Sequence, residues 1–418
     1  MKTTRIHVLL TVSILITLSN VTGAQSQAPA SVWKQLAKLT SKTGRQYDEL
    51  GFHAVISNDT VVANSGDGHV YVFVRPASGW KNTHEVAQLG ANNQYPGSSV
   101  TISGDTIVVG VVGATNQQDA VDVFVKPKGG WVDTNRPNAT LTSSDQGAGI
   151  FGVSTAIDGN TIVVGAPCKL EDSCSGPGAA YIFVKPASGW KNSTETAILS
   201  PSDGMNDDQF GDSVSIHEDT VAVGSAKSSG GRGAIYVYVE PKSGWKSTTE
   251  TARLGNPDHT FTGFGNTVAN TRTTVVAGAA GAKGQSGEVW VFQKPGGKWK
   301  STSKATARLT ASDGSAYDAF GASVAVGNKT IFAGAPGKAN QTGATYVYAE
   351  PAGGWKSTSK FTAELQAKDH SSGTDFGYSV TFDGITMVSS APDETIKGVV
   401  DQGAVYVFGP STGLERLQ

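Results

Sequence analysis

Aspartates recur at matching positions of this chain, shortly before a repeated Phe-Gly pair. The fullest sets precede Phe210, Phe320 and Phe376, and their members are Asp203, Asp207, Asp208, Asp313, Asp318, Asp369 and Asp375. Carboxylates gathered at one end of a strand could ligate a cation or bind a ligand. They could equally accept hydrogen bonds from nearby backbone N–H groups in turns. Because an active site is usually unique whereas architecture repeats, the repetition favours the structural role.

The other chemically reactive residue types show no catalytic spacing. The seven histidines occupy unrelated repeat positions and form no metal-binding pattern. Neither a G-x-S-x-G nor an H-E-x-x-H motif occurs in a fitting context. Acids from different loops could still meet as a glycosidase pair, which sequence alone cannot assign. We therefore expect no catalytic residues, no cofactor and no metal site, and keep a secreted hydrolase or lyase acting on polysaccharide as an alternative.

The only two cysteines, Cys168 and Cys174, are six positions apart in one loop. In an exported protein this close pairing predicts a disulfide that pins the loop. Metal binding by two cysteines without neighbouring histidines is the alternative.

The aspartates belong to a unit that the chain repeats seven times. Its best copies are Phe151–Pro167, Phe210–Ala226, Phe320–Pro336 and Phe376–Pro392, and weaker ones begin at Leu50, Pro96 and Phe264. The repeated glycines lie about 46 to about 59 residues apart, at Gly51, Gly97, Gly152, Gly211, Gly265, Gly321 and Gly377. Self-similarity in this range is typical of propellers and solenoids, whose units bury their faces against neighbours.

Each repeat reads as four short strands. In the fourth they are Ser213–Ile216, Thr220–Val223, Ala234–Val239 and a last strand from about Trp245 to Leu254. The third strand is apolar on both faces, so it must lie inside a stack of sheets, as in a β-propeller. A sandwich would leave most strands alternating. We predict an all-β, seven-bladed propeller of four-stranded blades over residues 32–414, nearly without helix, followed by a tail, 415–418.

The seventh repeat ends before its fourth strand, and the missing sequence stands at the other terminus. There, Trp33–Leu39 matches the last strand of the other repeats, and Trp33 becomes the seventh member of a series. The other members are Trp80, Trp131, Trp190, Trp245, Trp299 and Trp355. An N-terminal strand that completes the last blade would close the ring and remove an open sheet edge. The fixed place of these tryptophans after Pro-x-x-Gly predicts packing rather than sugar stacking.

Charge and the N-terminal sequence limit the compartment and the partners. The chain is 16% charged with a net charge of −2 and has no basic cluster, which argues against nucleic-acid binding. Residues 1–24 resemble a secretory signal, with Lys2 and Arg5 ahead of the apolar run Val8–Leu18. That run is too short to span a bilayer. We expect a linker over 25–31 and a mature protein that is secreted, or periplasmic in a bacterium, monomeric and not membrane-spanning.

The Phe-Gly pair and the Gly-Ala-Pro that closes the second strand resemble the FG-GAP repeat of the integrin α-chain propeller. The match is strongest at Phe151-Gly152 with Gly165–Pro167 and at Phe320-Gly321 with Gly334–Pro336. The resemblance implies a seven-bladed propeller used for extracellular recognition or adhesion and, in some relatives, for lectin activity. Family members often hold calcium in a long loop between the first and second strands. Here that connection is a tight turn with too few oxygens, so these sites are not carried over.

Function is expected where the repeats differ, in the loops that join the second and third strands. These loops share one face of the ring, and binding residues commonly lie on loops of a rigid scaffold. The candidate ligand-binding residues are Asp119, Asp172, Arg232, Asp393 and Glu394. The expected partner is an extracellular protein or glycan. A multivalent lectin with equivalent sites between blades is a second hypothesis, and drift in unconstrained loops is the alternative for each residue.

Overall fold

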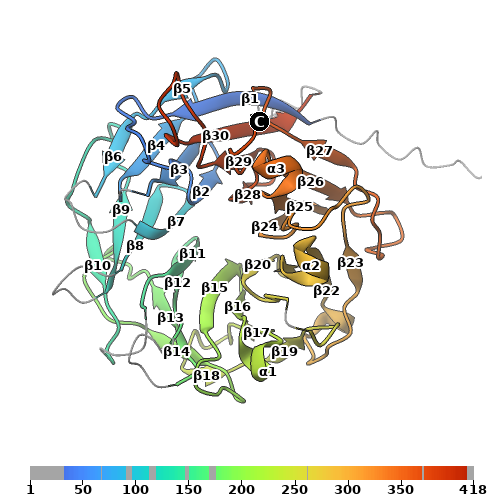
Figure 1. Ribbon diagram of the computed structural model, residues 1–418. Helices are drawn as coiled ribbons and strands as arrows, with labels where there is room; N and C mark the ends of the chain where they lie inside the picture. Colours follow the sequence, from blue (N-terminus) through green and yellow to red (C-terminus); the bar gives the residue numbers. More distant parts are fainter. Residues whose placement is uncertain are drawn as a thin grey trace, which may run out of the picture.

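In the computed structural model, seven antiparallel sheets surround a central axis (Figure 1). The structure describes residues 33–66, 68–90, 97–112, 119–145, 150–168, 176–260, 262–369 and 371–411. The predicted signal, linker and tail lie outside the described residues. The all-β, seven-bladed propeller predicted from the repeats is confirmed.

Each blade has four strands that run from the axis outward, numbered here from first to fourth. Blade one comprises β2 (Ala54–Ser57), β3 (Thr60–Asn64), β4 (Val70–Val74) and β6 (Ala87–Leu89). Blade two comprises β7 (Gly97–Ser103), β8 (Thr106–Val111), β9 (Ala120–Val125) and β10 (Ala139–Leu141). Blade three comprises β11 (Ser154–Asp158), β12 (Thr161–Ala166), β13 (Ala179–Val184) and β14 (Ala197–Ser200). Blade four comprises β15 (Phe210–His217), β16 (Thr220–Ser225), β17 (Ala234–Val239) and β19 (Ala252–Gly255). Blade five comprises β20 (Thr267–Asn270), β21 (Thr274–Ala279), β22 (Glu288–Gln293) and β23 (Ala307–Leu309).

The last two blades follow the same order, and the seventh takes its fourth strand from the N-terminus. Blade six comprises β24 (Ser323–Gly327), β25 (Thr330–Ala335), β26 (Ala344–Ala349) and β27 (Ala363–Leu365). Blade seven comprises β28 (Val380–Phe382), β29 (Met387–Ala391), β30 (Ala404–Pro410) and β1 (Trp33–Thr40). Three single-turn helices lie between second and third strands: α1 (Ser228–Gly231), α2 (Ala282–Gln285) and α3 (Lys338–Gln341). A short 3-10 turn covers Pro295–Gly297.

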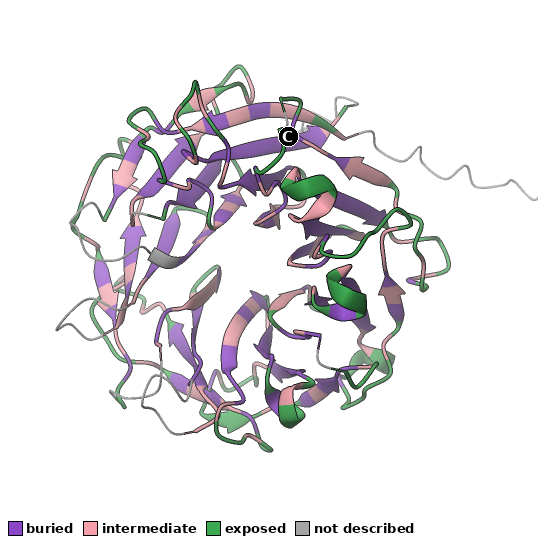
Figure 2. Ribbon diagram, in the orientation of Figure 1, coloured by how far each residue is buried: buried purple, intermediate pink, exposed green. Residues whose placement is uncertain are grey.

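The second and third strands of the blades are mostly buried, and exposed residues gather in the loops (Figure 2). The third strands are nearly continuous in burial, as their two-sided apolar sequence predicts. Each hydrophobic cluster joins neighbouring blades. One cluster combines Val163 and Ile182 of blade three with Val221 and Tyr236 of blade four and with Trp245. The predicted packing role of the tryptophans is confirmed here, because Trp245 is only 5% exposed.

The fourth strand is shorter than predicted. Instead of one strand from Trp245 to Leu254, the segment forms two pieces. Thr248–Thr249 (β18) pairs in parallel with β14 of the preceding blade, and only β19 pairs with β17 of its own blade. The same parallel contact joins Thr83–His84 (β5) to β1. Trp245 belongs to the hydrophobic cluster between blades three and four, so the residues that follow it lie beside the preceding blade.

The two glycines of the repeat meet between neighbouring blades. A Cβ added to Gly165 in β12 would clash with the carbonyl oxygen of Gly211, which opens the next blade. That same carbonyl accepts a hydrogen bond of 2.7 Å from Ser154 Oγ. Gly211 itself has a φ of 99°, a conformation that favours glycine. The repeated motif is therefore an inter-blade contact, and it recurs at the pairs Gly224 and Gly265, Gly278 and Gly321, and Gly334 and Gly377.

The ring closes in the predicted way. Strand β1 pairs antiparallel with β30, with Trp33 opposite Pro410 and Leu39 opposite Val405. Trp33 also packs edge-on against Phe332 of blade six, with 5.1 Å between ring centroids. The two ends of the folded chain are therefore held in one sheet.

Candidate functional site

Four of the five predicted ligand-binding residues are described, and they share a face without forming one site. Asp119, Arg232, Asp393 and Glu394 all lie between a second and a third strand, in blades two, four and seven. Asp172 lies outside the described residues. So does Cys174, and the predicted disulfide therefore stays a prediction, although its partner Cys168 is 3% exposed.

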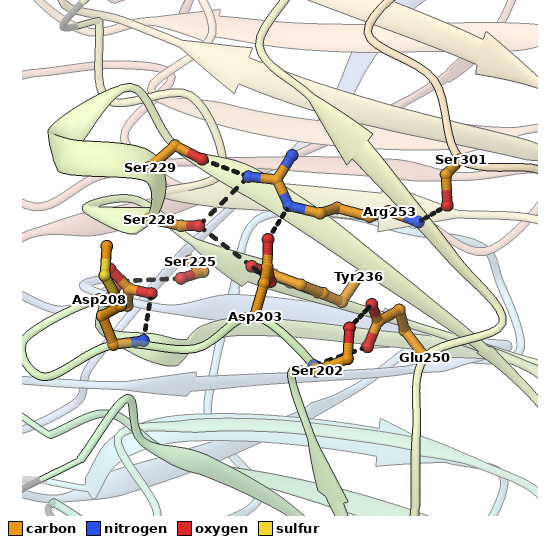
Figure 3. Close-up of polar contacts among 11 residues, drawn as sticks. Ser202, Asp203, Asp208, Ser225, Ser228, Ser229, Tyr236, Glu250, Arg253 and Ser301 are labelled. Atoms are coloured by element: carbon orange, nitrogen blue, oxygen red, sulfur yellow. Dashed lines mark hydrogen bonds and ion pairs between the residues drawn. The ribbon is translucent and has the colours of Figure 1, made fainter.

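The acids ahead of the Phe-Gly pair have two structural roles. In the first, a carboxylate binds the tyrosine of a third strand. In blade four, the Tyr236 hydroxyl donates to Asp203 Oδ1 at 2.7 Å, and Arg253 Nε lies 2.9 Å from Asp203 Oδ2 (Figure 3). The Arg253 guanidinium also lies over the Tyr236 ring, 5.7 Å from its centroid. This cluster joins the loop before the blade to its third and fourth strands.

Burial raises the pKa of Tyr236 to about 12, so its hydroxyl keeps the proton that it donates to Asp203. The hydroxyl also lies 3.0 Å from Ser228 Oγ in α1, and Ser229 of the same turn accepts from Arg253 (Figure 3). The α1 turn is thereby fixed to the blade through side chains.

The same arrangement recurs with cations from different chain positions. In blade seven, Lys38 Nζ lies 2.7 Å from Asp369 and 5.3 Å from the centroid of the Tyr406 ring. In blade six, Lys338 comes from α3, binds Asp313 at 2.6 Å and lies 5.2 Å from the Tyr346 centroid. The cation comes from the fourth strand in blades four and seven, and from the loop in blade six.

The second role is a turn closed by a carboxylate. Asp208 Oδ2 accepts a 2.8 Å hydrogen bond from the backbone N–H of Met205, and Asp318 accepts one of the same length from Ser315. Each spans three residues, as expected for aspartates that stabilise turns. The structural interpretation suggested by repetition is confirmed for these acids. Among the described residues, no three His, Cys, Asp or Glu side chains are grouped to hold a metal ion.

A polar cavity of about 460 Å³ opens beside the blade-four cluster. Its lining includes Asp203, Arg253 and Glu250, together with the predicted residue Arg232 and the exposed His259. Across the cavity, the hairpin of blade five contributes Ser301, Thr302 and Ser303. We call this the blade-four cavity.

A second cavity of about 620 Å³ occupies the matching place beside blade seven. Lys38 and Asp369 take the positions of Arg253 and Asp203, and Asn82, Thr83 and His84 take those of the hairpin residues. The predicted residue Glu394 lines this cavity but is 4% exposed and lies 2.9 Å from Lys38 Nζ. Its loop neighbour Lys397 is exposed and also lines the cavity. We call this the blade-seven cavity.

Sequence reasoning missed the cations of the fourth strand. They occupy the middle position of an Ala-x-Leu triplet, where Arg253 and Lys38 stand directly opposite Tyr236 and Tyr406 on the paired third strands. Opposed positions on antiparallel strands bring side chains into contact. The signal was available, because the flanking Ala and Leu repeat while the middle residue varies.

A separate group of acids lies where blade seven meets blade one. Burial and the nearby Asp393 raise the pKa of Asp375 to about 6. Burial and the nearby Asp401 raise the pKa of Asp393. Burial, Asp393 and Asp401 together raise the pKa of Glu49. The predicted residue Asp393 is thus part of a crowded carboxylate group.

The repeat has a counterpart among known protein families. Four stretches match the model of the FG-GAP repeat, residues 136–183, 193–238, 304–348 and 358–408. These four stretches are FG-GAP repeats, and the resemblance that their residues suggested is confirmed. No curated protein matches this chain. Among solved structures it is similar to the computationally designed Ika8 protein, with 13% identity, a TM-score of 0.49 and coverage of 90% of this chain and 99% of the other. No described helix is long and apolar enough to cross a membrane.

Proposed function

We propose that this FG-GAP propeller is a secreted, non-enzymatic recognition protein with an adhesion-like role. It binds an extracellular protein or glycan through the face that carries the loops between second and third strands. FG-GAP repeats are typical of extracellular proteins, which supports the proposed compartment. The proposal also rests on a contrast: the inter-blade contacts repeat, whereas the charged residues of this face change from blade to blade.

The blade-four cavity carries the proposal. Arg232 is exposed, and its side chain forms no hydrogen bond or ion pair with another residue that the structure describes. Its backbone carbonyl accepts a 2.8 Å hydrogen bond from Asn256 Nδ2. Asn256 is 2% exposed and also donates to the Thr260 carbonyl at 2.9 Å. It therefore ties together the two loops that carry Arg232 and His259. Because the backbone is already fixed, binding a partner would order the Arg232 side chain but not the loop that carries it.

One observation favours the lectin hypothesis as a second candidate. The blade-four and blade-seven cavities are built from equivalent positions of different repeats, as expected for a protein with several similar sites between blades. The hydrolase or lyase alternative is less well supported. Asp203 and Asp369 line the two cavities, but each is already engaged by a cation of the fourth strand.

A binding screen tests the proposal. The mature protein, residues 25–418, is presented to a glycan array, to a panel of extracellular proteins and to polysaccharides with assay for released product. One bound protein or glycan supports recognition, whereas product release from a polysaccharide contradicts it. The partner should then bind more weakly to a variant with Arg232, Asp172 and Asp393 all changed to alanine.

The matched control changes charged residues at the other end of the strands, in the turns between first and second strands. These are Arg272, Glu218 and Lys329. Unchanged affinity in the loop-face variant, together with weaker binding in the control, would place the site on the opposite face.

A further inference from the structure

We infer that the blade-four and blade-seven cavities are two equivalent sites for a carboxylate-bearing saccharide, such as a uronic or sialic acid residue. This inference rests on the proposed recognition function and names the ligand class for it. Its basis is a set of charges and hydroxyls that recurs in both cavities, contributed largely by equivalent positions of two different repeats.

The floor of each cavity is an ion pair laid over a tyrosine. In blade four, Arg253 pairs with Asp203 above Tyr236, and in blade seven Lys38 pairs with Asp369 above Tyr406. The carboxylate oxygens of these pairs are half exposed, with 48% and 49% of the aspartate side chains accessible. They remain available to accept hydrogen bonds from the hydroxyls of a sugar ring.

The rim of each cavity supplies one exposed cation. Arg232 borders the blade-four cavity and Lys397 the blade-seven cavity. Neither rim cation forms an ion pair with a residue in the described part of the chain, whereas Arg253 and Lys38 are both paired. A carboxylate group on the ligand would satisfy these rim cations with charge-assisted hydrogen bonds.

On its outer side, each cavity is lined by a segment of the next blade that carries hydroxyl groups. Hydrogen bonds from the fourth strand of the preceding blade hold this segment in place. Ser301 Oγ accepts from the Arg253 backbone N–H at 3.0 Å, and Asn82 Oδ1 accepts from that of Lys38 at 2.8 Å. Thr302 and Thr83 lie next to them and line the cavities. A histidine completes each lining, His259 or His84.

The charge balance decides the ligand class. Each cavity holds two cations and two carboxylates, with Glu250 and Glu394 as the second carboxylates. A cavity with no net charge, many hydroxyls and one unpaired cation suits a polyhydroxy ligand with a single negative group. A highly charged anion would find only one unpaired cation there to offset the loss of its hydration.

Equilibrium dialysis measures the sites directly. The probes are methyl β-D-glucuronide and methyl α-N-acetylneuraminide, and methyl β-D-glucoside is the neutral control. We expect at least one acidic probe to bind at two molecules per chain and at least tenfold more tightly than the glucoside. Equal binding of the glucoside, or displacement of the acidic sugar by sulfate as effectively as by itself, would overturn the inference.

Single substitutions separate the two sites. R232Q and K397Q should each reduce the stoichiometry from two to one, and the double variant should bind no acidic probe. Both residues are exposed, so folding should be preserved. The exposed Arg272 on the opposite face provides the control R272Q, which should keep two sites. Stoichiometry of two in the double variant would place the ligand elsewhere.

The outcome is distinguishable from failure of the proposed function. If a protein partner binds in the screen while neither acidic sugar binds, recognition stands and the saccharide inference is wrong. If no partner binds and neither sugar does, both are wrong.

Discussion

Single glycines hold this ring together because they allow two backbones to touch. Gly165 and its equivalents in blades four to six each face the carbonyl oxygen of the next blade's Phe-Gly glycine, where no side chain fits. Packed interiors accept extra atoms poorly. The spacing between blades is thus set by residues without side chains, and the large residues fill what remains.

Gly165→Ala should therefore destabilise the protein by about 1–3 kcal/mol, because the added methyl forces the backbones of blades three and four apart. The measurement is urea unfolding followed by tryptophan fluorescence. Gly129→Ala is the matched control, since a Cβ at Gly129 meets no atom within 4 Å. Equal unfolding midpoints for the two variants would contradict the contact.

Asp375 is a second residue whose setting has a measurable consequence. Its native pKa of about 6 lies above its ordinary value of 3.8, so the native state binds the proton more tightly than the unfolded chain. Above pH 6 the ionised carboxylate is destabilised by burial and by the nearby charge of Asp393, whereas below 3.8 the group is neutral in both states.

Asp375→Asn should accordingly raise stability at pH 7–8 by on the order of 1 kcal/mol, after allowance for solvent screening. The gain should shrink as the pH falls from 6 toward 4. Thermal melts across this range measure it, and the pH dependence separates charge from backbone effects. The exposed Asp258→Asn serves as control, and a gain independent of pH would contradict the crowding.

At the scale of elements, the loops before Phe210, Phe320 and Phe376 are stabilised by the protein's own cations. Asp313 binds Lys338 and the Tyr346 hydroxyl, and Asp369 binds Lys38. The hydrogen bond and charge of Lys338 outweigh burial and hold the pKa of Asp313 below its usual range. Lysine and arginine thus stand where an acidic loop would otherwise need an external cation.

We therefore expect thermal melts with excess calcium and with chelator to coincide. Two features support this expectation: lysine or arginine already pairs with the loop aspartates, and the turns between first and second strands are tight. Differential scanning calorimetry provides the measurement. A rise of ten degrees or more with calcium would show that the crowded acids near Asp375 bind the ion.

The whole molecule depends on one strand supplied from the far end of the chain. Without β1, β30 would present an open edge, and the aromatic contact of Trp33 with Phe332 would be lost. Exposed edges of this kind promote aggregation.

Deletion of residues 25–40 should cause a large loss of thermal stability or aggregation, measured by melting and by size-exclusion chromatography. Deletion of residues 25–31 alone is the control and should melt like the mature protein. A chain lacking residues 25–40 that stayed monomeric with an unchanged melt would disprove closure by β1.

Sequence was sufficient for the architecture because its signals are local and repeated. The two-sided apolar third strands and the displaced Trp33 segment predicted the blades and the closure. The division of the fourth strand was missed, because the sequence marks Trp245 as buried without saying against which blade. The cavities were also missed. Each combines three segments, such as Asp203, Arg253 and Ser301, which only the ring geometry brings together.

The pairing of β1 with β30 also sets an order of events during synthesis. Residues 33–40 leave the ribosome before every other strand that the structure describes, whereas their partner, residues 404–410, leaves after all the others. Strand β1 therefore stays without its β30 partner until β30 has been synthesised, whereas blades one to six can form in sequence before then. Termination before residue 404 would leave β1 without its partner and the ring open, so only a chain translated through β30 can form the closed ring.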